Sequence, residues 1–164
     1  MKKIIILSFI LISSFANAQA YKGKGDVKFQ VGANLQKWGS GISVSTDFGI
    51  GENMSYGFVG SYLLNTNQDF GMPKFEDRVD VKARFNANLG NVLKISDKAD
   101  VYPGLDLGLR NFGAHLGARY FFTNGFGVYS EAGFPIAKYN TNPTSEYYNL
   151  NNQFVITIGA CFNL

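Results

Sequence analysis

The chain has 164 residues, a length that fits a single domain. Fifteen basic residues against twelve acidic ones give a net charge of +3, which is too close to neutral to favour nucleic-acid binding. One cysteine excludes an intramolecular disulfide, and one cysteine with one histidine gives no support to a metal site of the usual nitrogen and sulfur ligands, so no cofactor is expected.

Residues 1–18 have the parts of a secretory signal peptide. Lys2 and Lys3 precede an apolar run over residues 4–12, and Ala16-Asn17-Ala18 provides an A-x-A cleavage site. The apolar run is much shorter than the ~20 residues of a membrane-spanning helix. Cleavage after Ala18 removes two lysines and therefore lowers the net charge from +3 to +1. We expect residues 19–164 to form the mature domain, exported through the inner membrane.

Eight later segments alternate between apolar and polar residues with the two-residue period of a β-strand. They span residues 26–36, 42–50, 56–64, 78–89, 100–110, 114–122, 126–136 and 154–164. In the fourth segment the odd positions from Val79 to Leu89 are apolar, whereas the even positions from Arg78 to Asn88 are polar or charged. All twelve charged residues within the eight segments lie on the side opposite the apolar one. Pro103 lies on the apolar side of the fifth segment and weakens that prediction, because it donates no hydrogen bond.

Every predicted strand therefore has an uncharged apolar face, and no helix or second sheet is available to cover it. Most segments have nine to eleven residues, close to the ~9–11 that a tilted strand needs to cross the hydrocarbon of a bilayer. In lipid only helices and closed barrels satisfy every backbone polar group. The sequence predicts an all-β fold, a closed eight-stranded antiparallel up-and-down transmembrane β-barrel, with its apolar face outward.

The connections between the segments predict how the barrel is oriented. An even number of strands returns both ends of the chain to one side, which for an exported protein is the periplasm. The turns near 52–54, 91–97 and 123–125 then lie in the periplasm, and the connections near 37–41, 65–77, 111–112 and 138–152 lie outside. The two long connections both fall on the outer side, as expected for this kind of barrel.

Aromatic residues gather near the predicted strand ends. The periplasmic ends carry Phe48, Tyr56, Phe122, Phe126 and Phe162, and the outer ends carry Trp38, Tyr62, Phe134 and Phe154. Smaller residues lie between these two groups. The pattern predicts two aromatic girdles, one at each lipid–water interface.

The inward face carries six acidic and six basic residues, and the equal numbers predict a neutralised network that fills the lumen. Nine of the ten glycines within the segments also point inward, which leaves room for long side chains. We expect Arg119 and Glu131, which flank the Asn124-Gly125 turn, to pair across their hairpin. The expected lumen network comprises Lys28, Asp47, Arg84, Asp106, Arg110, His115, Arg119 and Glu131.

Two stretches resemble a known class of proteins. Gly117-Ala118-Arg119-Tyr120-Phe121-Phe122-Thr123-Asn124-Gly125, followed by Tyr129-Ser130-Glu131-Ala132-Gly133-Phe134, resembles the penultimate hairpin of small outer-membrane β-barrels of Gram-negative bacteria. This is the eight-stranded OmpX-like and OmpA-like class, many of whose members are uncharacterised. The resemblance implies location in the outer membrane and contact with its lipid, but no particular activity.

The closing strand is similar to the C-terminal signal by which such barrels reach the outer-membrane assembly machinery. Its alternating residues are Phe154, Ile156, Ile158, Ala160, Phe162 and Leu164. The class usually ends on an aromatic residue, whereas this chain ends on Leu164 with Phe162 two positions earlier. The resemblance implies that the assembly machinery is a partner, with Phe154, Ile156, Ile158, Phe162 and Leu164 as its signal.

Our leading hypothesis for function is a structural or surface-interaction role through the outer loops, with no enzymatic activity and with the protein as a monomer. The loop over 138–152 carries tyrosines and asparagines, a composition suited to adaptable contacts with a partner that the sequence does not identify. A second hypothesis is a lipid-modifying enzyme centred on His115, with Ser43, Ser45 or Ser61 as a nearby nucleophile. A third is a narrow porin-like ion path along the charged lumen.

Overall fold

A computed structural model describes residues 19–66, 73–139 and 150–164. The predicted signal peptide lies outside the described residues, as do parts of the two long connections, at 67–72 and 140–149. None of the helices among the described residues has the length and apolar character needed to cross a membrane.

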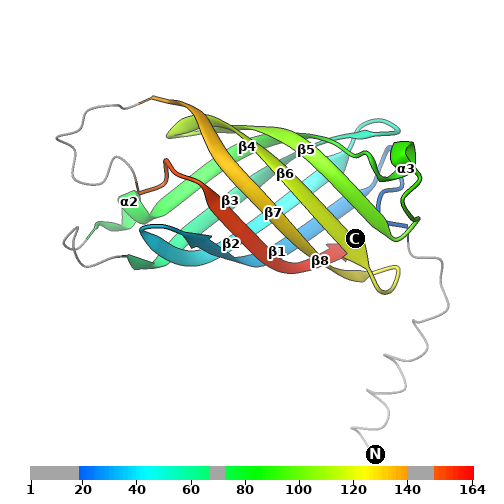
Figure 1. Cartoon of the computed structure of the whole chain (residues 1–164), viewed down its shortest axis with the longest axis horizontal. Coiled ribbons are helices and arrows are strands. Elements are labelled where there is room, and N and C mark those ends of the chain that lie inside the picture. The colour runs from blue at the N-terminus through cyan, green and yellow to red at the C-terminus, as the bar shows by residue number, and fades with distance from the viewer. Residues whose placement is uncertain (1–18, 67–72, 140–149) are drawn as a thin grey trace, which may run out of the picture.

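Eight antiparallel strands close into a barrel in which each strand pairs with its neighbours in sequence and the last pairs with the first (Figure 1). The strands are β1 (Val27–Gln36), β2 (Gly39–Gly49), β3 (Met54–Thr66), β4 (Val79–Ala87), β5 (Ala99–Gly108), β6 (Asn111–Phe121), β7 (Phe126–Lys138) and β8 (Val155–Asn163). Each overlaps one of the eight predicted segments. The prediction of a closed eight-stranded up-and-down β-barrel is confirmed.

Alternation along each strand separates two kinds of surface. The outward aliphatic residues are largely exposed, and Ile158 of β8, for example, keeps 53% of its surface accessible. The inward charged residues are buried, and Arg119 of β6 keeps only 2%. The barrel therefore has an apolar exterior and a charged interior, because parity fixes the face on which each side chain lies.

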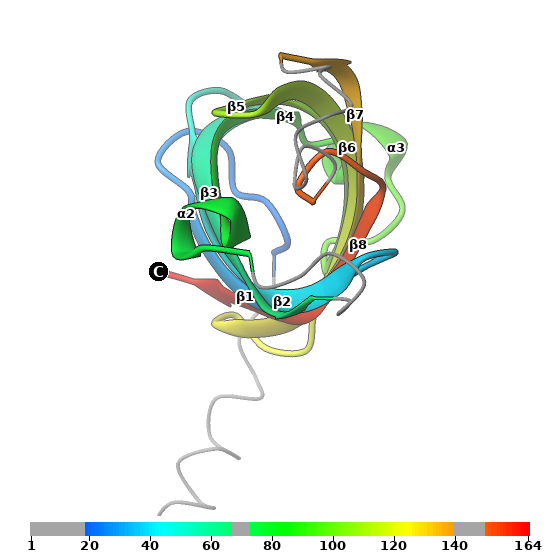
Figure 2. The same ribbon diagram turned by 90° about the vertical axis from the view of Figure 1, so that its left-hand side faces the viewer.

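The two ends of the barrel differ. One end, called here the termini end, holds residues 19–26, the C-terminal residue Leu164 and the short helix α3 (Gly90–Leu93) between β4 and β5 (Figure 1). The other, called here the loop end, holds the short helix α2 (Phe75–Arg78) and the connections from β3 to β4 and from β7 to β8 (Figures 1 and 2). The strand pattern gave no sign of either helix, since each has only four residues.

Strand β5 continues through Pro103, but the proline shortens its pairing with β4. The ladder between these strands runs only from Lys82↔Gly108 to Asn86↔Gly104, whereas β5 pairs with β6 along most of its length. Leu89 N–H donates to the carbonyl of Val101. The backbone N–H and carbonyl groups of odd-numbered residues in β5 therefore point toward β4. Pro103 has no N–H to offer on that side, so the ladder stops beside it.

Candidate functional site

Two arginines and one tyrosine occupy the centre of the barrel interior. Arg119 of β6 donates from Nη2 to Oδ2 of Asp100 at 2.7 Å and to Oδ1 of Asn88 at 2.5 Å. The ring of Tyr102 lies 4.5 Å from the guanidinium carbon of Arg119 and 5.7 Å from that of Arg84. The tyrosine ring thus lies near two cations, both within cation–π range and Arg119 the nearer.

Arg84 of β4 is held by two carboxylates from other strands. Its Nη2 lies 2.6 Å from Oε2 of Glu131, and its Nε lies 3.4 Å from Oδ1 of Asp47. The second oxygen of Asp47 is 3.7 Å from Nη1 of Arg119, so this carboxylate lies between the two arginines. Charges removed from water persist when they are paired in this way.

The expected pair between Arg119 and Glu131 is not the one that forms. In the β6–β7 register Arg119 is opposite Tyr129 and Glu131 is opposite Gly117, so the two residues are diagonal neighbours. Arg119 turns instead to Asp100 on its other side, and Glu131 reaches Arg84 across the lumen. The hairpin is as predicted, but the interior offers each side chain a closer partner from another strand.

His115 is buried beside these arginines. Its Nδ1 lies 3.0 Å from Oδ2 of Asp106, and its Nε2 lies 2.8 Å from Oδ1 of Asn86 and 3.0 Å from Nη2 of Arg84. Among the described residues no serine hydrogen-bonds to this histidine, and Ser45 Oγ donates to Gln30 instead. Each ring nitrogen therefore lies about 3 Å from a polar side-chain atom of the network.

Arg110 lies outside the interior, which differs from its expected place in the lumen network. It lies two residues after the end of β5, and its guanidinium donates to the backbone carbonyl of Glu76 in α2 at the loop end. The strand ends at Gly108, so the alternation that predicted an inward side chain no longer applies. The other seven expected members are all in the interior: Lys28, Asp47, Arg84, Asp106, His115, Arg119 and Glu131.

The residues before β1 close the termini end from within. Ala20 N–H donates to the carbonyl of Asp97 at 2.6 Å, and the hydroxyl of Tyr21 donates to the carbonyls of Gly51 and Met54. Burial raises the pKa of Tyr21 to about 12, and the nearby carboxylate of Asp26 adds to this rise.

Lys28 of β1 connects this segment to the interior. It forms an ion pair with Asp26, and its ammonium lies 5.5 Å from the ring centre of Phe121 and 5.9 Å from that of Tyr21. Sequence reasoning placed Lys28 and Asp26 inward but missed Tyr21. The only sequence feature that could have indicated a buried Tyr21 is its position between the predicted cleavage site and the first strand, shortly before two glycines.

Those two glycines, Gly23 and Gly25, have φ of +92° and +85°. Residues with a side chain rarely adopt this left-handed backbone conformation, whereas glycine adopts it without a steric penalty. They allow the chain to turn from the buried Tyr21 into β1.

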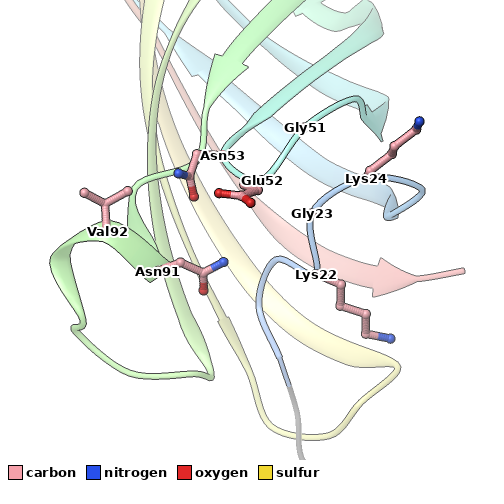
Figure 3. A pocket seen from close by; sticks show the side chains of 8 residues that line it. All are labelled: Lys22, Gly23, Lys24, Gly51, Glu52, Asn53, Asn91 and Val92. Atoms are coloured by element: carbon pink, nitrogen blue, oxygen red, sulfur yellow. The ribbon is translucent and has the colours of Figure 1, made fainter.

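The described residues line spaces both within the barrel and at its termini end. A cavity of about 40 Å³ lies near the loop-end side of the network, where Lys82, Asp106 and Glu131 are among its lining residues. A larger, shallow hollow of about 580 Å³ lies outside the barrel at the termini end, where Glu52, Asn53 and Asn91 border it (Figure 3). The described residues contain no group of three or more His, Cys, Asp or Glu side chains arranged to hold a metal ion.

The closing strand β8 presents its expected signal residues to the outside. Phe154, Ile158 and Leu164 are well exposed, and Ile156 is exposed to a smaller extent. The ring of Phe162 lies 5.6 Å from that of Phe126 and 6.3 Å from that of Phe29.

Comparison with solved structures supports the fold. A de novo designed transmembrane β-barrel is similar with a TM-score of 0.58 at 10% identity, covering 87% of this chain and 98% of the design. The N-terminal β-barrel domain of Pseudomonas aeruginosa OprF is similar with a TM-score of 0.52 at 8% identity, covering 87% of this chain and all of that domain. These likenesses show a fold shared with membrane barrels.

Comparison with sequences gives one match. A family model described as "Family of unknown function (DUF6646)" matches residues 10–164. No curated protein matches the chain.

Proposed function

The chain belongs to DUF6646, a family of unknown function, and we propose that it is an integral outer-membrane barrel of the OmpX-like and OmpA-like class with a plugged polar lumen. In this proposal it has a structural or surface-interaction role through its outer loops, and it is not an enzyme. Export through the inner membrane follows from the signal peptide predicted at residues 1–18, which stays a prediction.

The observation that carries the membrane location is the apolar exterior. Outward residues around the whole barrel are uncharged, and some are as exposed as Leu107, at 62%. Soluble monomers rarely expose a contiguous apolar surface of more than a few hundred Å². A soluble lipocalin-like barrel would have the reverse arrangement, with apolar residues inside and charges outside. A lipid environment removes this conflict, because the hydrocarbon would cover the exposed band.

Aromatic contacts at the termini end support the same proposal. The rings of Phe48 and Tyr56 lie 5.4 Å apart, and those of Phe122 and Phe126 lie 6.1 Å apart. Phe126 also contacts Phe162, so aromatic contacts join β7 to β8 as well as β2 to β3. Rings gathered at one level of a barrel are typical of an interfacial girdle.

The membrane location is tested by fractionation and by gel migration. We expect the protein in the outer-membrane fraction, and we expect the purified protein in detergent to migrate differently before and after boiling, as closed membrane barrels do. A mature protein that stays soluble and monomeric without detergent would overturn the proposal.

A plugged lumen is supported by the packing of the network. Arg84, Arg119 and Tyr102 meet at the barrel centre with almost no exposed surface, and an eight-stranded barrel is only wide enough for its own side chains. We expect no stable conductance in planar bilayers. Discrete, long-lived openings would favour the narrow ion path instead.

The enzymatic alternative is tested at His115. Its enclosure by Asp106, Asn86 and Arg84 supports a role within the network, since a catalytic base must reach a substrate proton. We expect His115→Ala to leave the lipid A and phospholipid composition of the cell unchanged. A composition that changed in the same way with His115→Ala and with deletion of the gene would favour a lipid-modifying enzyme.

The outer loops are proposed as the functional surface, with the loop end facing outward and the termini end facing the periplasm. Short epitope tags at position 145 and after Asn124 test this orientation. We expect antibody to bind intact cells that carry the first tag and to bind the second only in permeabilised cells. The opposite result would invert the barrel and place the long loops in the periplasm.

The outer-membrane assembly machinery is proposed as a transient partner that recognises β8, and the folded barrel as a monomer. We expect Phe162→Ala to lower the amount of heat-modifiable protein in the membrane, whereas Phe75→Ala, in the exposed part of α2, serves as a control. Equal amounts for both variants would argue against a signal in β8.

A further inference from the structure

The turn between β4 and β5 carries three large aliphatic residues that nothing in the described structure covers. Val92, Leu93 and Ile95 expose 56%, 56% and 52% of their surfaces. The turn includes α3, which stands at the termini end outside the outline of the barrel wall (Figures 1 and 2). We call residues 90–98 the apolar turn.

The other two turns at this end have polar tips. Gly51, Glu52 and Asn53 form the tip between β2 and β3, and Thr123, Asn124 and Gly125 form the tip between β6 and β7. The difference within one end of one barrel indicates that the apolar turn meets a different environment.

The apolar turn is fixed in its position by hydrogen bonds. Gly90 N–H donates to Oδ1 of Asp100 at 2.9 Å, and Leu93 N–H donates to the carbonyl of Leu89 at 2.8 Å. Asn91 Nδ2 also donates to the carbonyl of Tyr21 at 3.2 Å. The aliphatic side chains are therefore held outside the barrel.

Lys94 gives a second indication that the apolar turn meets a different environment. It has φ of +49° and is the one non-glycine residue with positive φ in the described part of the chain. Glycine would adopt this conformation at the end of a helix without a steric penalty. A lysine here keeps a positive charge beside the aliphatic residues, and Lys98 adds another exposed charge at the base of the turn.

We infer that the apolar turn lies in the lipid headgroup layer next to the termini end, with its aliphatic side chains reaching the acyl chains and Lys94 and Lys98 meeting lipid phosphates. Leu89 and Val101, which flank the turn in sequence, lie on the outward face of the barrel wall. The turn continues that apolar face. Aliphatic residues with neighbouring lysines are typical of segments that lie in the membrane interface. The inference rests on the membrane location proposed above.

Tryptophan fluorescence tests the inference in the full barrel. Trp38 at the loop end is first replaced by Phe, and a single tryptophan is then introduced by Leu93→Trp, Glu52→Trp or Ile158→Trp. Each variant is reconstituted in vesicles of phosphatidylcholine and phosphatidylglycerol, with phosphatidylcholine brominated near the headgroup end or near the end of the acyl chain. Heat-modifiable migration identifies the variants that have folded.

We expect Leu93→Trp to show blue-shifted emission that shallow bromine quenches more than deep bromine does. Ile158→Trp, on the barrel waist, should be quenched most by deep bromine, and Glu52→Trp should emit as in water. Water-like emission from Leu93→Trp together with quenched Ile158→Trp would overturn the inference alone and would leave the turn free for a protein partner. Unquenched emission from Ile158→Trp would instead overturn the membrane location.

The charge of Lys94 has its own test, because glycine also fits its backbone. In the Leu93→Trp background, Lys94→Gly should reduce the difference in emission between vesicles with and without phosphatidylglycerol. An unchanged difference would contradict a contact between Lys94 and lipid phosphates.

Discussion

Asp100 of β5 and Arg119 of β6 are direct partners in the strand register, and one carboxylate oxygen of Asp100 accepts two hydrogen bonds from Arg119. The other oxygen accepts the N–H of Gly90 at the start of the β4–β5 turn. One buried side chain therefore connects the interior network to the turn that we place in the membrane interface.

Loss of the Asp100 carboxylate should lower the free energy of unfolding. Asp100→Asn leaves Arg119 with Asp47 as its remaining carboxylate, at 3.7 Å. Breaking a buried ion pair by removing one partner costs about 3–5 kcal/mol. Urea unfolding of the reconstituted barrel measures this change. The control is Glu52→Gln at an exposed position in the turn between β2 and β3, which should fall within about 0.5 kcal/mol of the wild type. Similar values for both variants would show that the buried pair contributes little.

An arginine on the lipid-facing surface midway along the barrel should be destabilising, because it would place a charge in the hydrocarbon. Ala118 of β6 is exposed on the outward face, and Ala118→Arg should lower the free energy of unfolding in a bilayer by about 2–4 kcal/mol. Ala118→Leu keeps the surface apolar and is the matched control, expected to be close to the wild type. A similar loss for both variants would point to crowding at this site and not to the cost of a charge in lipid.

Two glycines on opposite faces should respond differently to a methyl group. A Cβ at Gly117 would lie 2.2 Å from Cζ of Tyr102, whereas a Cβ at Gly60 would have no atom within 4 Å. Gly117→Ala should destabilise the barrel by about 1–3 kcal/mol, the usual range for overpacking. Gly60→Ala should be neutral or stabilise it by up to about 1 kcal/mol. Unfolding in urea compares the two, and a stable Gly117→Ala variant would mean that Tyr102 can move.

Alkaline pH should weaken the closure of the termini end. An unperturbed tyrosine ionises near pH 10, whereas burial raises the pKa of Tyr21 to about 12. The folded state thus holds the proton to higher pH than the unfolded chain does. The contribution of Tyr21 to stability is complete below about pH 10 and is lost as the pH rises to about 12. The difference in stability between the wild type and Tyr21→Phe should shift in that range, and a constant difference would contradict a buried neutral hydroxyl.

The strands could be predicted because their signal is local. Alternation from Val79 to Leu89 or from Phe126 to Ile136 fixes both the strand and the face of each side chain, and the barrel depends on little else. The ends of strands were less certain. The β1–β2 connection is only Lys37-Trp38, since β2 already begins at Gly39, and β7 continues to Lys138.

The partners inside the lumen could not be predicted in the same way. The choice of Asp100 by Arg119 and of Arg84 by Glu131 depends on which strands face each other across the interior, and that depends on the stagger of the whole barrel. The place of Tyr21 depends on how the end of the barrel is filled, which no periodic pattern encodes.

The pairing of β1 with β8 has a consequence for assembly. It joins residues that are nearly as far apart in sequence as the described part of the chain allows, from Lys28↔Asn163 to Gln36↔Val155. Neighbouring hairpins form from local contacts. The pairing of β1 with β8 has the largest loop-closure cost, so it is expected to form late. Until it forms, β1 and β8 present unpaired edges that could associate with other chains. A barrel of this topology is therefore most vulnerable to aggregation in the last step of its folding.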